Sequence, residues 1–171
     1  MLKTLLAVPM LVLISSFSAA GETPGGYAYV VAGPVVVPQS AYTRWNGDFI
    51  SVTGGGEGRV VGRFALGGEM GVLKPVTNQY AVATGVASVS PAFHFVSKHS
   101  ASKVDPFVNG GFSLLFGRGS GFGMHYGGGV NYWVRRRVGL RFEFRHYLWS
   151  PESGELVHLV SFRFGIVLHT G

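Results

Sequence analysis

The sequence alternates large apolar residues with polar or small residues at period two, and it does so over unusually long stretches. In VGLRFEFRHYL, residues 138–148, Phe142 and Phe144 share one parity, whereas Arg141 and Glu143 share the other. Successive side chains of a β-strand point to opposite faces, so this pattern predicts a strand with one apolar and one charged face. An amphipathic helix would instead repeat its apolar residues every three to four positions.

Eight such runs follow one another along the chain, separated by segments rich in Gly, Pro, Ser or Arg. The runs cover residues 26–37, 47–60, 63–74, 80–96, 106–117, 121–134, 139–149 and 156–169. Strands of soluble proteins cluster at about 5–6 residues, whereas a strand that crosses a membrane needs about 9–11 residues. The length of the runs therefore predicts an all-β fold, an eight-stranded antiparallel up-and-down transmembrane β-barrel.

The polar parity carries small residues and a nearly balanced set of charges, which differs from a solvated face rich in Lys and Glu. Only 13% of the residues are charged, about half the usual share of a soluble domain. Small residues and paired charges suit a narrow barrel lumen, where side chains must fill the space and satisfy each other. We expect a lumen ionic network of Glu57, Arg59, Glu69, Arg141, Glu143, Arg145 and Arg163.

Several Tyr and Trp residues lie near the ends of the runs. Membrane barrels carry girdles of aromatic residues at both membrane–water interfaces. The sequence therefore predicts that an aromatic girdle includes Tyr27, Tyr29, Tyr132, Trp133, Tyr147 and Trp149.

The first twenty residues have the composition of a secretory signal peptide. Lys3 precedes an apolar run, residues 5–14, and Ser18-Ala19-Ala20 forms a small-residue cleavage site. We expect residues 1–20 to be removed and residues 21–171 to form a single outer-membrane barrel domain. The sequence contains no Cys, so strand pairing and packing must stabilise the exported chain without disulfides.

Other function classes find little support in the sequence. Residues 135–137 are three consecutive Arg, but no interleaved aromatic residues accompany them, so we expect lipid headgroups rather than nucleic acid as their partner. The Gly-rich segments 54–58 and 117–123 lack the Gly-Lys-Ser/Thr ending of a phosphate loop. No pair of His residues shows the spacing of a metal site, so we expect neither metal nor cofactor.

A catalytic alternative rests on one end of the last two runs. His146, Ser150 and either Glu152 or Glu155 could form a Ser–His–acid arrangement, as in a hydrolase that modifies lipid A. His146, however, has the parity of the apolar, lipid-facing side. The sequence therefore predicts no catalytic residues, and a lipid-modifying enzyme stays as an alternative.

Residues 106–117, PFVNGGFSLLFG, and 121–148, GFGMHYGGGVNYWVRRRVGLRFEFRHYL, resemble the last hairpins of small OmpA-like eight-stranded outer-membrane β-barrels. The resemblance implies eight strands, both termini in the periplasm, and insertion into the bacterial outer membrane by its assembly machinery. Family members usually end on an aromatic residue, whereas the last Phe here is Phe164. We expect a monomer whose partners are outer-membrane lipids and lipopolysaccharide, and no nucleic acid.

An eight-stranded barrel has an interior that side chains fill. We therefore expect a structural or interaction role, with at most a narrow gated conductance. The alternative is an exported soluble barrel that binds a hydrophobic ligand, as lipocalins do. That alternative predicts apolar residues inside and charges outside, the reverse of a membrane barrel.

Overall fold

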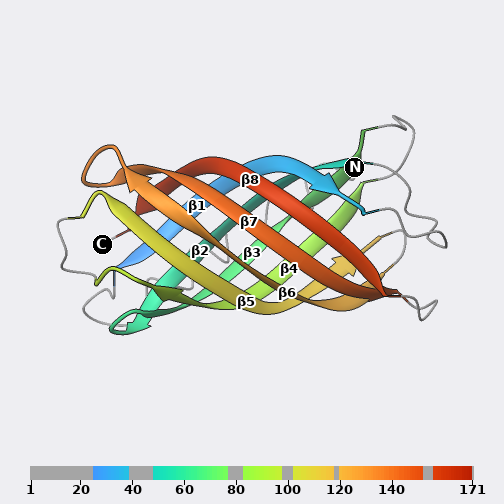
Figure 1. Cartoon of the computed structure of the whole chain (residues 1–171), viewed down its shortest axis with the longest axis horizontal. Coiled ribbons are helices and arrows are strands. Elements are labelled where there is room, and N and C mark those ends of the chain that lie inside the picture. Colours follow the sequence, from blue (N-terminus) through green and yellow to red (C-terminus); the bar gives the residue numbers. More distant parts are fainter. Residues whose placement is uncertain are drawn as a thin grey trace, which may run out of the picture.

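The computed structural model describes residues 25–38, 48–76, 83–97, 102–117, 120–151 and 156–170. The predicted signal peptide lies outside these residues. Figure 1 shows long, tilted strands wrapped into one barrel. The strands are β1 (Gly26–Val36), β2 (Phe49–Val61), β3 (Phe64–Pro75), β4 (Thr84–His94), β5 (Val104–Phe116), β6 (Gly121–Trp133), β7 (Val138–Pro151) and β8 (Val157–His169).

The eight strands form a closed barrel in which each strand pairs antiparallel with its neighbours in sequence, and β1 closes on β8. Short turns at residues 62–63 and 134–137 lie at the end where β1 begins and β8 ends, which we call the turn end. The predicted fold class is therefore confirmed. Among the described residues, no helix is long and apolar enough to cross a membrane.

Strand boundaries match the predicted runs to within a few residues, with one consequential difference. We expected β5 to begin at Pro106 after a polar turn, but it begins at Val104. Asp105 therefore lies within the strand, where it pairs with Asn131 of β6 and faces the lumen. Pro106 lies near the start of the strand, where Pro is tolerated, and its carbonyl still accepts a hydrogen bond from Phe95 N at 2.9 Å.

The seam between β1 and β8 depends on glycine. A Cβ on Gly33 would lie 1.9 Å from the carbonyl oxygen of Phe162, and a Cβ on Gly165 would lie 1.9 Å from that of Val30. Real Cβ atoms do not approach backbone oxygens so closely, so only Gly lets the two strands come together here.

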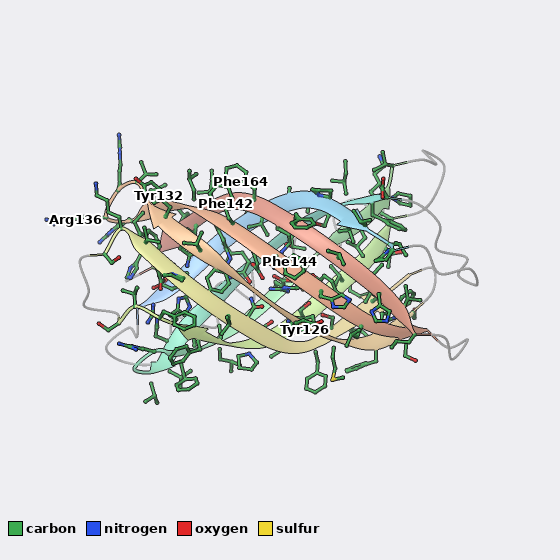
Figure 2. All side chains as sticks on the ribbon, viewed as in Figure 1. Tyr126, Tyr132, Arg136, Phe142, Phe144 and Phe164 are labelled. Atoms are coloured by element: carbon green, nitrogen blue, oxygen red, sulfur yellow. The ribbon has the colours of Figure 1, made fainter. Side chains whose placement is uncertain are left out.

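The outer surface of the barrel is apolar and the lumen is polar. Phe122 is 62% exposed and Phe112 is 59% exposed, while Arg141 is fully buried. Phe142 packs on Phe164 across β7 and β8, with ring centroids 4.7 Å apart, and Figure 2 shows these rings on the barrel wall. This arrangement is the reverse of a soluble carrier with an apolar interior.

The predicted aromatic girdle is wrong for most of its members. Tyr27, Tyr29 and Tyr147 are 6–7% exposed and Trp149 is fully buried, all inside the barrel. Proximity to strand ends suggested the girdle, but parity decides the face, and Tyr147 has the parity of Arg141 and Arg145.

The two remaining aromatic residues of the predicted girdle differ from each other. Trp133 is partly buried against Tyr27, with ring centroids 5.4 Å apart. Tyr132 alone of the six lies on the outer face, where it is 43% exposed.

Candidate functional site

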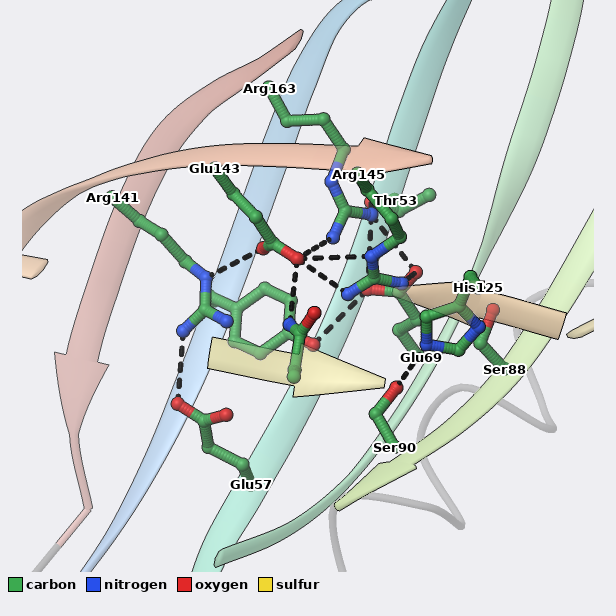
Figure 3. Close-up of polar contacts among 12 residues, drawn as sticks. Thr53, Glu57, Glu69, Ser88, Ser90, His125, Arg141, Glu143, Arg145 and Arg163 are labelled. Carbon is green, nitrogen blue, oxygen red and sulfur yellow. Dashed lines mark hydrogen bonds and ion pairs between the residues drawn. The ribbon is translucent and has the colours of Figure 1, made fainter. Parts of the chain in front are cut away.

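The centre of the lumen is an ionic network organised around Glu143 of β7 (Figure 3). Its carboxylate lies 3.1 Å from Nε of Arg141, 2.6 Å from Nη2 of Arg145 and 2.7 Å from Nη2 of Arg163. Asn109 Nδ2 of β5 also donates to Glu143, at 2.9 Å. Alternation places Arg141, Glu143 and Arg145 on the same inward face of one strand. One carboxylate therefore holds three guanidinium groups.

Two more carboxylates reach the same guanidinium groups from across the barrel. Glu69 of β3 pairs with both Arg145 and Arg163. Arg163 Nη1 lies 2.9 Å from Glu69 Oε1. Glu57 of β2 accepts from Arg141 at 2.9 Å. These contacts connect strands on opposite sides of the closed sheet, so the network cross-braces the barrel.

Aromatic side chains complete the surroundings of Arg141. Its guanidinium carbon lies 4.2 Å from the ring centroid of Tyr29 and 4.1 Å from that of Phe107. A desolvated cation–π contact stabilises the charge, at about 2 kcal/mol. Tyr29 also donates to Glu69 at 3.2 Å. The predicted girdle residue Tyr29 is thus part of the lumen network.

A second polar cluster lies nearer the turn end and includes two residues that the sequence analysis missed, His94 and Asp105. His94 Nδ1 lies 2.9 Å from Asp105, and its Nε2 lies 3.5 Å from Glu57. Arg59 pairs with Asp105 at 3.4 Å and donates to Tyr27 Oη at 2.9 Å. Arg59 therefore enters the network through Asp105.

Asp105 also changes the charge balance of the lumen. We expected three acids against four Arg. The described lumen contains four acids, Glu57, Glu69, Glu143 and Asp105, against four Arg. The network is therefore neutral when His94 is neutral. Asp105 has the same parity as Phe107 and Asn109, so alternation could have placed it in the lumen. It was assigned to a turn because the predicted strand began at Pro106.

A neutral layer follows on the other side of the central network. His125 of β6 lies 2.7 Å from Ser90 Oγ and 2.8 Å from Ser113 Oγ, and Ser113 in turn lies 2.9 Å from Ser88. All four side chains are buried. With no carboxylate on the ring, this is a hydrogen-bonded layer rather than a catalytic triad.

An apolar cluster closes the end of the lumen opposite the turn end, and we call it the apolar cap. Trp149 is its largest member and is fully buried. The cap consists of Val35, Val37, Phe49, Leu73, Val86, Leu115, Tyr147, Trp149, Val157 and Leu159. Charged groups therefore fill one part of the lumen and close-packed apolar groups fill this end, so the described residues leave no wide aqueous path.

The catalytic alternative on β7 and β8 lacks the required geometry. His146 and Ser150 are four residues apart on one strand, which separates them by about 13 Å. The ring nitrogens of His146 instead lie 2.6 Å from Tyr126 Oη and 3.2 Å from His158 Nδ1. Glu152 and Glu155 lie outside the described residues.

No protein-family model matches the sequence, and no curated protein matches it. Solved structures do match the fold. Neisserial surface protein A, NspA, superposes with a TM-score of 0.68 at 15% identity, over 84% of this chain and 96% of that one. The N-terminal β-barrel domain of Pseudomonas aeruginosa OprF gives 0.59 at 13% identity, over 86% and 98%.

A third similar structure is the attachment invasion locus protein Ail of Yersinia pestis. It superposes with a TM-score of 0.52 at 13% identity, over 85% of this chain and 99% of that one. At such low identity the likeness concerns the fold, and the closed eight-stranded antiparallel sheet agrees with it. The chain has the fold of the small eight-stranded outer-membrane β-barrels.

Proposed function

We propose that this protein is integral to a bacterial outer membrane and has a structural or interaction role, with at most a narrow gated conductance. The observation that carries the proposal is an apolar outer surface around a lumen that side chains fill. Lipid satisfies the exposed Phe, Val and Leu side chains, and the closed sheet leaves no unpaired strand edge in the hydrocarbon.

The lumen contents support a stabilising role for the charges. Each of the seven predicted network residues lies in the lumen, with no more than 6% of its surface exposed. A substrate or ion would have to displace paired, buried groups, which costs several kcal/mol per ion. We infer that these residues fill and brace the barrel rather than transport or transform a ligand.

Exposed basic residues gather at the turn end. Arg63, Lys103 and the three Arg of residues 135–137 are exposed there, while Glu57 and Asp105 at this end are buried. Exposed apolar residues flank these bases, such as Phe64 at 60% and Val134 at 58%. Bases beside apolar side chains suit anionic lipid headgroups.

Short turns are typical of the periplasmic end of an outer-membrane barrel, and the turns at residues 62–63 and 134–137 lie at the turn end. We therefore place the turn end, where β1 begins and β8 ends, at the periplasmic leaflet, with both termini of the mature chain. Phospholipids would surround the turn end, and lipopolysaccharide would surround the opposite end. The outer-membrane assembly machinery would insert the chain, and the complete pairing of every strand favours a monomer, since no edge is left to join a second copy.

Membrane fractionation combined with a heat-modifiability gel tests this proposal. We expect the mature protein in the outer-membrane fraction, extractable only with detergent, and a shift in gel mobility between unheated and boiled samples. Recovery in the periplasm without detergent would refute the membrane location, and a large steady conductance of the purified barrel in planar bilayers would refute the filled lumen.

A further inference from the structure

In the part of the chain that the structure describes, the outer face of the barrel carries a polar cluster that is separate from the lumen network. Tyr126 of β6, His146 of β7 and His158 of β8 form a row across three adjacent strands, surrounded by lipid-facing apolar residues. Tyr126 is 52% exposed, and Figure 2 shows it on the outer wall. His158 is exposed and His146 is half-buried.

The imidazole rings of His146 and His158 lie next to each other, with one nitrogen atom of each ring in contact. His146 Nε2 lies 3.2 Å from His158 Nδ1, and the rings are stacked with centroids 5.2 Å apart and planes 27° from parallel. Two imidazole nitrogens on one tetrahedral metal, each at about 2.0–2.1 Å, lie about 3.3 Å from each other. The observed separation is therefore close to that of a chelate.

The contact between Tyr126 and His146 is compatible with the tautomer that a metal requires. His146 Nδ1 lies 2.6 Å from Tyr126 Oη. When Nδ1 carries the proton and donates it to this oxygen, the Nε2 lone pair points at His158. A hydrogen bond from the other ring nitrogen commonly fixes the tautomer and orientation of a metal-binding His.

We propose that His146 and His158 form a two-histidine chelate for a divalent first-row transition ion on the outer face of the barrel. Imidazole suits Cu²⁺, Ni²⁺ and Zn²⁺, and the expected order of affinity is Cu²⁺ first, then Ni²⁺ and Zn²⁺. Water or phosphate oxygens of lipid headgroups would supply the remaining ligands. Spacing in the sequence gave no sign of this site because its two ligands meet only through strand register.

Titration of the untagged, folded mature protein in detergent micelles with Cu²⁺ tests the proposal, by calorimetry and by electron paramagnetic resonance. We expect one ion per chain and a spectrum with two nitrogen ligands. His146→Gln or His158→Gln should each lower the affinity about 10²–10⁴-fold, because loss of one of two linked ligands removes the chelate effect. Tyr126→Phe should lower it about tenfold.

A matched control is His169→Gln at the turn end, which should leave Cu²⁺ binding unchanged. Because the ion would join β7 to β8, it should also raise the temperature of the heat-modifiability shift in the parent chain but not in the doubly substituted H146Q/H158Q chain. Binding that survives in the double variant, or a spectrum without nitrogen ligands, would overturn the proposal. These readouts use the folded barrel, so they do not depend on its location or conductance.

Discussion

Replacement of Glu143 by Gln should strongly destabilise the barrel while preserving its shape. Glu143 contacts the guanidinium groups of Arg141, Arg145 and Arg163 and is 4% exposed. Glu143→Gln removes one of four lumen acids, so the described network changes from neutral to a net charge of about +1.

The magnitude follows from the number of contacts and their burial. One pair of unit charges about 4 Å apart is worth about 4 kcal/mol at an effective dielectric constant of about 20. Three such attractions to Glu143 are lost, but the variant no longer buries a carboxylate and Gln still accepts hydrogen bonds. Breaking a buried ion pair from one side costs about 3–5 kcal/mol after these offsets, and we expect a loss in that range.

Urea unfolding in lipid vesicles, followed by Trp fluorescence, measures this loss. The matched control is Asp48→Asn, which changes an exposed carboxylate outside the lumen and should alter the free energy of unfolding by less than about 0.5 kcal/mol. The double variant Glu143→Gln with Arg163→Gln restores the charge balance. Its cost should fall below the sum of the single costs by about 0.5–3 kcal/mol.

Two results would refute this reasoning. One is a Glu143→Gln variant whose free energy of unfolding differs from that of the parent by less than about 1 kcal/mol. Removal of a buried carboxylate that contacts three guanidinium groups should cost more than that. The other is strict additivity in the double variant, which would show that Glu143 and Arg163 act independently despite the 2.7 Å contact.

Three further substitutions probe the rest of the barrel. Gly33→Ala should destabilise the barrel by at least about 1–3 kcal/mol, because the added Cβ would lie 1.9 Å from the Phe162 carbonyl oxygen. The control Gly68→Ala, whose Cβ would lie 3.8 Å from the nearest atom, should fold normally. The heat-modifiability gel measures both variants. Trp149→Ala should cost about 3–5 kcal/mol in urea unfolding and raise conductance in planar bilayers, because it opens the apolar cap; an unchanged conductance would show that the cap is not the barrier. Phe144→Arg places a charge on the lipid face and should lower the free energy of unfolding by about 2–4 kcal/mol. An unchanged free energy of unfolding would argue against lipid contact.

Parity alone predicted much of the fold. The alternation around Phe142 and Phe144 gave the strands, and the opposite parity of Arg141, Glu143 and Arg145 gave the lumen face. Contacts such as Arg141 with Glu57 could not be predicted, because they join β7 to β2 across the lumen and depend on the stagger of a closed sheet.

Predictions that followed a local cue instead of parity were wrong. Tyr27, Tyr29, Tyr147 and Trp149 lie near strand ends, which suggested a girdle, but their parity directs them inward. Asp105 follows polar residues and precedes Pro106, which suggested a turn. The pair His146 and His158 is separated in sequence and is brought together by the diagonal register of β7 and β8.

In the proposed arrangement, apolar side chains on the outer surface face lipid, and polar side chains fill a lumen that excludes lipid. Nuclear Overhauser contacts between lipid acyl chains and protein side chains, measured in lipid nanodiscs, test this arrangement without changing the sequence. Phe112 and Phe162 are 59% and 54% exposed, whereas their neighbours Ser113 and Ser161 are each 1% exposed. We predict acyl-chain contacts at the two Phe rings and none at the two Ser side chains. Contacts with the opposite parity, or equal contacts at all four positions, would contradict the membrane barrel.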